Sequence, residues 1–224
     1  MVWSSLLELL LPTRCAGCDL PGDLLCEECR QALPLIEREW ACPRCGAPFG
    51  HLVCTECWKA EPAFEAGVCV GSLAAPLSRC ISLYKDAGER RLGVLLGDML
   101  GTTVGVWREW PQAVVPIPPS ETALRRRGFD HTGVIGSRVA AALGVPLIHA
   151  LASAGARDQR VLGRVERRRN VEDAFVATGG GPLPPRVLLV DDVMTTGATL
   201  DAASAVLLAA GAEVVRVGTI ARAW

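Results

Sequence analysis

Residues 187–199 read Val-Leu-Leu-Val-Asp-Asp-Val-Met-Thr-Thr-Gly-Ala-Thr, an apolar run followed by two acidic residues and a loop rich in Thr and Gly. A four-residue apolar run such as Val187–Val190 is typical of a buried parallel strand. The run should deliver Asp191 and Asp192 at its carboxyl end, where open α/β sheets bind their ligands. Threonine hydroxyls, loop N–H groups and the N-terminus of the next helix together form a cradle for phosphate.

Two carboxylates beside a phosphate site need an explanation, because anions repel one another. Ribose hydroxyls supply one explanation, since they donate hydrogen bonds to carboxylates, and a bridging Mg²⁺ supplies another. The pattern therefore indicates a site for a sugar phosphate, and the chain lacks the lysine motif of a P-loop ATPase. The structural alternative is that Thr195 or Thr196 caps a helix whose positive end favours the acidic residues. That alternative accounts for one acidic residue, but not for two together with the Thr and Gly series.

The rest of the carboxyl-terminal part alternates between short apolar runs and segments with helical spacing. We expect strands at 67–73, 113–117, 146–150, 174–177, 187–190 and 214–220, and helices at 87–106, 132–143 and 200–210. Strands that alternate with helices imply a parallel sheet with right-handed crossovers. The predicted fold class is therefore α/β.

Eight of the ten cysteines form four Cys-x2-Cys pairs near the amino terminus: Cys15, Cys18, Cys26, Cys29, Cys42, Cys45, Cys54 and Cys57. A Cys-x2-Cys turn places two thiolates on one side of a metal ion, and structural zinc takes four ligands in a tetrahedron. A segment this short is not expected to fold on its own apolar burial, so zinc supplies the missing stability. We interpret the cysteines as structural zinc ligands rather than as a redox or disulfide system.

The four pairs can combine into two sets of four in a sequential, cross-braced or nested way. We favour the sequential pairing, with two zinc ions, because the loops inside the two sets then have similar lengths of 7 and 8 residues. Composition shifts near Trp58, and Lys59–Glu65 has the character of a linker. We predict a double zinc-ribbon domain at 1–60 and a second domain at 61–224.

The composition of the 224-residue chain excludes some classes of protein. Half of it is apolar and its net charge is −1, which argues against a disordered protein and against a basic nucleic-acid coat. The apolar segment Met1–Leu11 has no Lys or Arg before it and stops at Pro12, unlike a signal peptide. No apolar run approaches the roughly 18 residues of a membrane-spanning helix. We expect a cytoplasmic protein with no membrane insertion, where paired cysteines bind metal.

At Asp191 and Asp192 the chain resembles the type I phosphoribosyltransferases, whose signature is four apolar residues, two acidic residues and a Thr/Gly loop. Further motifs resemble the ComF (ComFC) family of competence-associated proteins, which also carries an amino-terminal cysteine ribbon. These motifs are Val114-Val-Pro-Ile-Pro, Arg127-Gly-Phe, Gln159-x2-Leu162 and Arg167-x2-Asn170-x3-Ala174-Phe175. The resemblance runs from about residue 6 to the end. It implies a central parallel sheet with helices on both faces, a small hood and the zinc ribbon.

The resemblance also implies roles for individual residues. Asp191 and Asp192 would hold the ribose 2- and 3-hydroxyls of phosphoribosyl pyrophosphate, with Mg²⁺ as a cofactor. The 5-phosphate would lie against Thr195, Thr196, Gly197, Ala198 and Thr199. The segment Pro116–Phe129 would be the pyrophosphate loop, with Arg127 among its cations, and Ala154–Asp173 would be a loop that closes over the site. Lys85, in a Tyr-Lys pair like that of the family, would add a cation; a surface lysine is the alternative.

One motif departs from the family, which usually reads Arg-Gly-Phe-Asn-Gln where this chain has Asp130 and His131 in the last two positions. We interpret His131 as a residue that starts a helix rather than as a substituted polar contact. Arginine is abundant between Pro119 and Asn170, where some side chains would neutralise pyrophosphate. The same arginines could be a solvated run or could bind single-stranded nucleic acid, a role that needs interleaved aromatic residues. Only Phe129 lies between the first and last arginine clusters.

The favoured function is a Mg²⁺-dependent phosphoribosyltransferase, associated through the family resemblance with competence and DNA uptake. The alternatives are a non-catalytic sensor of phosphoribosyl pyrophosphate and a single-stranded-DNA-binding accessory of natural transformation that works with other competence proteins. No base-recognition motif is legible, so the sequence does not name an acceptor.

Overall fold

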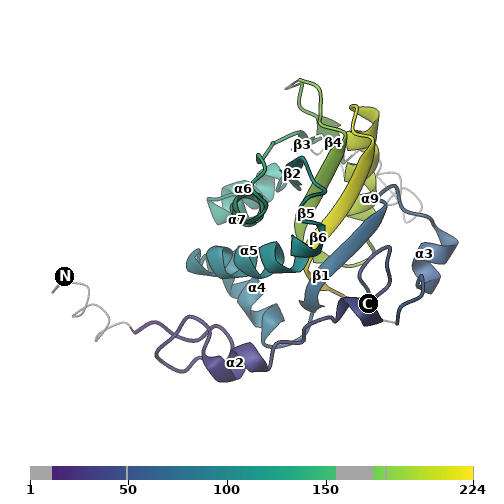
Figure 1. Ribbon diagram of the computed structural model, residues 1–224. Helices are drawn as coiled ribbons and strands as arrows, with labels where there is room; N and C mark the ends of the chain where they lie inside the picture. The colour runs from purple at the N-terminus through teal and green to yellow at the C-terminus, as the bar shows by residue number, and fades with distance from the viewer. Residues whose placement is uncertain (1–11, 49, 155–173, 180, 224) are drawn as a thin grey trace, which may run out of the picture.

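The computed structural model describes residues 12–48, 50–154, 174–179 and 181–223. Its centre is a four-stranded parallel sheet in the order β1-β6-β5-β2 (Figure 1). The strands span Ala66–Ser72 (β1), Ala113–Pro116 (β2), Arg186–Met194 (β5) and Val214–Arg222 (β6). The parallel sheet expected from the sequence is confirmed, and its two longest strands, β5 and β6, lie in the middle.

Helices cover both faces of the sheet (Figure 1). The helices of the carboxyl-terminal part span Leu77–Lys85 (α4), Arg91–Val104 (α5), Glu121–Arg127 (α6), His131–Leu143 (α7) and Ala198–Ala209 (α9). Successive residues of a strand point to opposite faces. In β5, Leu188 and Val190 accordingly pack with α4, α5 and α7, whereas Val187 and Leu189 pack with α9. The apolar run of β5 is thus buried on both sides, as a central parallel strand requires.

The strand expected at 146–150 is wrong. Leu147 makes only an isolated parallel bridge with Val114, and the regular strand is β3 (Leu151–Ser153), which pairs antiparallel with β4 (Phe175–Ala177). Pro146 has no N–H to donate, and β2 is only four residues long, so this edge of the sheet cannot extend into a full ladder. Helices α4 and α6 were also not indicated by the apolar spacing.

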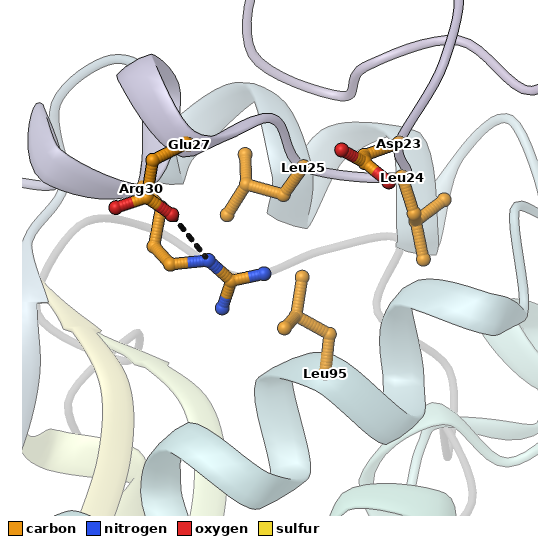
Figure 2. A pocket seen from close by; sticks show the side chains of 6 residues that line it. All are labelled: Asp23, Leu24, Leu25, Glu27, Arg30 and Leu95. Atoms are coloured by element: carbon orange, nitrogen blue, oxygen red, sulfur yellow. Dashed lines mark ion pairs between the residues drawn. The ribbon is translucent and has the colours of Figure 1, made fainter.

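The two cysteine segments pack against opposite faces of the sheet. They contain the short helices α2 (Glu27–Gln31) and α3 (Thr55–Lys59). Cys15 and Leu25 are buried in the cluster that contains α4 and α5, and Figure 2 shows Leu24, Leu25 and Leu95 of α5 lining one pocket. Cys42, Cys45 and Cys54 are buried in the cluster that contains α9. The domain boundary near residue 60 stays a prediction.

Two 3-10 turns, Arg38–Trp40 and Gly105–Trp107, complete the elements of the described chain. In that same part of the chain, no helix combines the length and the apolar character needed to cross a membrane.

Candidate functional site

The acidic pair lies inside β5, not after it as the sequence indicated. Strand β5 pairs with β6 as far as Met194, opposite Arg222, which carries the extended backbone past both carboxylates. Asp191 is 9% exposed and Asp192 is 4% exposed. Because neighbouring strand residues alternate, Asp192 points to the α4 and α7 side of the sheet and Asp191 to the other.

Asp192 holds two polar side chains on one carboxylate oxygen. Its Oδ2 atom lies 2.6 Å from Nζ of Lys85, the last residue of α4, and 3.0 Å from Nε2 of His131, the first residue of α7. Burial by itself opposes ionisation, but the hydrogen bond from His131 and the charge of Lys85 lower the pKa of Asp192 to about 2. Asp192 is therefore a paired, ionised carboxylate.

Asp191 is in the opposite electrostatic situation. Its burial, followed by the negative charge of Asp192, raises the pKa of Asp191 well above its ordinary value. The backbone N–H of Asp192 donates to Asp191 Oδ1 at 2.8 Å. Two adjacent carboxyl groups with pKa values pushed apart are a common feature of functional sites.

The interpretation of His131 as only a helix-start residue is wrong. His131 does begin α7, where the side chain of the preceding Asp130 caps the helix by accepting from Gly133 N at 2.8 Å. The His131 ring is nonetheless 95% buried and contacts Asp192. The hydroxyl of Tyr84, on α4, donates to the His131 carbonyl at 2.7 Å, which connects the start of α7 to α4.

The Thr/Gly loop follows β5 and leads into α9. Gly197 has a φ of +83°, in the left-handed region that favours glycine, and it precedes the first helical residue. Gly197 has no side chain with which to cap the helix, but Thr196 Oγ1 accepts a hydrogen bond from the N–H of Ala198 at 3.4 Å, so Thr196 makes the kind of contact that the capping alternative expects. Thr195, Thr196, Ala198 and Thr199 are exposed, so the side chains and the helix N-terminus face solvent as an anion site requires.

Arg222 is a candidate site residue that sequence reasoning missed. It ends β6, is 5% exposed, and its Nη1 atom donates to the carbonyl oxygens of Met194, Thr195 and Ala223. These bonds attach a positive charge to the start of the Thr/Gly loop. The pattern contained no signal for it, since Arg222 follows an apolar run that seemed to stop at Ile220. A cavity of about 830 Å³ separates Arg222 and the loop from residues 52–56 of the second cysteine segment.

The arginines of α6 divide into two kinds. Arg127 Nη1 lies 3.3 Å from Nδ1 and 3.4 Å from Nε2 of His131, so Arg127 belongs to the acidic site. Arg125 pairs with Glu121 of its own helix at 2.6 Å, and Arg126 pairs with Asp86 at 3.4 Å. A cavity of about 730 Å³ is lined by residues 85–88, Arg126 and Arg127. Of the two cations expected near the site, Lys85 contacts Asp192 directly and Arg127 contacts His131.

The predicted closing loop, Ala154–Asp173, lies outside the described residues except for Ala154. The motif positions Gln159, Leu162, Arg167 and Asn170 lie outside them too. Phe129, the one aromatic residue among the arginines, packs edge-on against Tyr84 at 5.4 Å between ring centroids and lies under Arg90. Its ring is therefore engaged by its neighbours.

The cysteines gather into the two sequential quartets that were predicted, Cys15/Cys18/Cys26/Cys29 and Cys42/Cys45/Cys54/Cys57. Within each quartet the Sγ atoms all lie within 4.8 Å of one another, and individual pairs are 3.6 to 3.8 Å apart. A tetrahedron with zinc–sulfur bonds of about 2.3 Å has edges of about 3.8 Å. Both quartets therefore fit a structural zinc ion with four cysteine ligands.

Backbone groups prepare the first quartet for metal. Burial opposes ionisation of Cys15, but N–H groups of Cys26, Cys18 and Gly17 lower the pKa of its thiol to about 6. From α4, Arg79 Nη1 donates to the carbonyl oxygens of Cys15, Ala16 and Gly17 at 3.4, 3.2 and 2.9 Å. Helix α4 therefore contacts the first quartet near its start and Asp192 at its end.

Comparison with known families identifies two parts of the chain. A family model for the double zinc ribbon domain matches residues 6–58, and one for the phosphoribosyl transferase domain matches residues 181–223. The first match contains all eight quartet cysteines, and the second contains the acidic pair and the Thr/Gly loop. Each match thus coincides with one of the two kinds of site described above.

Several curated proteins are similar along most of the chain. Competence protein F of Haemophilus influenzae is 29% identical over 89% of this chain and 90% of its own length. The DNA utilization protein YhgH of Escherichia coli K12 is 28% identical over 96% of this chain and 99% of its own. Competence protein ComFC of Streptococcus pneumoniae is 26% identical over 88% of this chain and 87% of its own.

Solved structures are also similar to part of this chain. The glutamine phosphoribosylpyrophosphate amidotransferase of B. subtilis aligns with a TM-score of 0.41 and 24% identity over 57% of this chain, which spans 25% of that larger chain. An adenine phosphoribosyltransferase aligns with a TM-score of 0.39 and 16% identity, covering 64% of this chain and 75% of that one.

Proposed function

We propose, from the premise that this chain belongs to the ComF family, that it binds phosphoribosyl pyrophosphate together with Mg²⁺ and acts as a phosphoribosyltransferase. The observation that carries the proposal is the placement of Asp191 and Asp192 directly before an exposed Thr/Gly loop and a helix N-terminus. Residues 191–199 thus provide hydrogen-bond acceptors for sugar hydroxyls and hydrogen-bond donors for a phosphate, close together along the chain. It lies at the carboxyl ends of parallel strands, the usual ligand edge of such sheets.

Each part of the ligand has matching chemistry in the described residues. Asp191 and Asp192 accept hydrogen bonds from the ribose 2- and 3-hydroxyls. Residues 195–199 hold the 5-phosphate through hydroxyl and N–H groups, and Arg222 supplies the nearest buried positive charge. Arg127 and Lys85 face the opposite side, where they neutralise pyrophosphate; an arginine suits the bidentate geometry of phosphate oxygens.

The acidic pair also fits a magnesium ion, because carboxylate oxygens are the ligands that this hard cation prefers. Asp192 Oδ2 is buried and lies 2.6 Å from Lys85 Nζ and 3.0 Å from His131 Nε2, so a magnesium ion bound to this oxygen would take the place of one of these two partners. Bound Mg²⁺ supplies positive charge that stabilises the leaving pyrophosphate. The residues of the chain position the sugar and compensate charge around the anomeric carbon.

Calorimetry tests the pocket. We expect phosphoribosyl pyrophosphate to bind the wild-type protein in the presence of Mg²⁺, and binding to be lost in the double variant Asp191→Asn/Asp192→Asn. The matched control is Asp98→Asn, which changes an exposed aspartate paired with Arg138 far from the acidic pair. Equal binding by the double variant and the wild type would refute the assignment.

A second assay separates a transferase from a non-catalytic sensor that uses the same pocket. A transferase releases pyrophosphate when it is supplied with its acceptor, whereas a sensor binds the same ligand and releases none. We therefore propose to screen nucleobases and amines for pyrophosphate release at a saturating ligand concentration. Release that depends on Asp192 supports the enzyme, and binding without release for any acceptor supports the sensor.

A second candidate is an accessory role with single-stranded DNA and competence proteins in natural transformation. The names of the relatives, two competence proteins and a DNA utilization protein, support it. Binding of an oligonucleotide should then weaken strongly between 50 mM and 200 mM salt. The variant Arg125→Ala/Arg126→Ala should reduce it, since both side chains are exposed cations outside the acidic site.

We also propose that the protein works in the cytoplasm. The support is chemical, because free cysteine quartets that fit zinc persist where thiols stay reduced. Fractionation of cells that express the tagged full-length chain checks this location.

A further inference from the structure

The ring of His131 lies against both Asp192 and Arg127. On one side its Nε2 atom lies 3.0 Å from Asp192 Oδ2, and on the other Arg127 Nη1 approaches its ring nitrogens at 3.3 and 3.4 Å. Asp192 is the carboxylate assigned above to the ribose, and Arg127 is a cation assigned to the pyrophosphate. One buried ring therefore touches a residue from each half of the ligand site.

The backbone around His131 holds the ring in place. Its carbonyl oxygen accepts the Tyr84 hydroxyl at 2.7 Å, and the preceding Asp130 caps α7. The ring is 95% buried, whereas the other partner of Asp192, the Lys85 side chain, is 22% exposed and ends in a flexible stem. His131 is thus the rigid partner of Asp192 and Lys85 the mobile one.

Arg127 depends on the same ring. Its Nε atom is buried without a hydrogen-bond partner, and the His131 ring provides the contacts of its Nη1 atom that the structure shows. Loss of the ring would therefore remove the contacts of Arg127 Nη1 and would leave Asp192 with Lys85, its more exposed partner, alone.

We propose that His131 is a positioning residue that holds the carboxylate of Asp192 and the guanidinium of Arg127 in their relative orientation for a phosphoribosyl pyrophosphate ligand. This inference rests on the proposed function of the acidic site. His131 acts through its two neighbours and does not itself contact the ligand. A side chain at this position needs a hydrogen-bond donor that reaches Asp192 and a polar atom that reaches Arg127, and it must therefore be about as long as the histidine side chain.

Three substitutions separate this role from simple packing. Glutamine keeps a donor and an acceptor at similar reach, leucine keeps the volume but neither polar group, and asparagine keeps the amide but is one methylene too short. We expect calorimetry with Mg²⁺ and phosphoribosyl pyrophosphate to show His131→Gln within about threefold of the wild type. His131→Leu should bind at least about tenfold more weakly, as expected when a hydrogen bond to a charged group is lost. His149→Leu, at an exposed histidine, is the matched control and should bind as the wild type does.

A double-mutant cycle tests whether the effect runs through Asp192. In the Asp192→Asn background, the fold loss of affinity caused by His131→Leu should be less than half of the fold loss that it causes in the wild type. Binding by His131→Leu that equals the wild type, or equal losses for His131→Gln and His131→Leu, would overturn the inference. If His131→Leu does not fold, the comparison of His131→Gln with His131→Asn decides it, since only the first should bind normally. Absence of binding by the wild type would instead refute the proposed function.

Discussion

Lys85 Nζ lies 2.6 Å from Asp192 Oδ2, and this contact joins the end of α4 to the centre of the sheet. Six residues earlier on the same helix, Arg79 donates to three carbonyl groups around the first cysteine quartet. Helix α4 is therefore attached at one end to a structural metal site and at the other to the candidate ligand site. The contacts of Arg79 with the first cysteine quartet and of Lys85 with Asp192 together hold Lys85 in place.

The Lys85→Met variant tests the energetic importance of this contact. Removing the ammonium leaves Asp192 buried with His131 as its remaining partner, so we expect the free energy of unfolding to fall by about 1–3 kcal/mol. The chain has one other lysine, Lys59, which lies in α3 and is exposed, so Lys59→Met is the control and should change stability little. Urea denaturation of the three proteins measures the difference, and equal midpoints would show that the Lys85 contact contributes nothing.

Replacing the two adjacent aspartates should change stability in opposite directions. Asp192→Asn removes a carboxylate whose pKa is lowered to about 2 by its partners, so the protein should lose stability at pH 7. Asp191→Asn removes a carboxylate whose pKa is raised by burial and by Asp192, so the protein should become more stable. Thermal unfolding at one pH compares them, and shifts of the same sign would contradict the assignment.

The pH dependence of the Asp191→Asn effect follows from linkage. An unfolded aspartate ionises near pH 4, whereas the folded Asp191 keeps its proton to higher pH, so rising pH favours the unfolded chain. The stabilisation by Asp191→Asn should therefore be small at pH 3.5 and grow as the pH rises above about 4. Asp98→Asn, at an exposed aspartate, serves as the control, and a gain that is constant across this range would exclude the raised pKa.

The two quartets predict a zinc content of two ions per chain. Cys29→Ser and Cys57→Ser should each reduce it to about one, because each removes a ligand from a different quartet. The buried Cys69, which accepts a hydrogen bond from Thr219 and belongs to neither quartet, provides the control Cys69→Ala with two zinc ions retained. Elemental analysis of the purified proteins checks all three, and a wild-type value well below two would disprove the double site.

Arg222 should matter for the 5-phosphate part of the ligand. Arg222→Met removes the charge and the bonds that attach β6 to the start of the Thr/Gly loop, so ribose 5-phosphate should bind at least about tenfold more weakly. Arg186 begins β5 at the other end of the same sheet and is exposed, which makes Arg186→Met the matched control. Titration followed by NMR measures both, and unchanged affinity in Arg222→Met would remove this residue from the site.

Local patterns predicted the elements with strong apolar runs. Strands β1, β5 and β6 and helices α5, α7 and α9 were found because burial on a regular face imposes a regular spacing. The failures have equally specific reasons. The segment 146–150 looked like a strand, but Pro146 and the short neighbour β2 prevent a ladder. The end of β5 was placed too early, because two aspartates look like a strand terminus unless β6 is known to continue beside them.

The sequence by itself determined the chemistry of this protein. Eight cysteines in Cys-x2-Cys pairs predicted the two sulfur quartets that the structure shows, and Asp191-Asp192 before a Thr/Gly loop predicted a polar ligand site that stays a proposal, because both patterns depend on residues that are close along the chain. Only the tertiary structure decided the partners that come from distant segments. The packing of α4 and α7 around β5 brings Lys85 and His131 to Asp192, and β6 brings Arg222 to the Thr/Gly loop; the resemblance suggested only Lys85, since spacing along the chain carries no record of such long-range contacts.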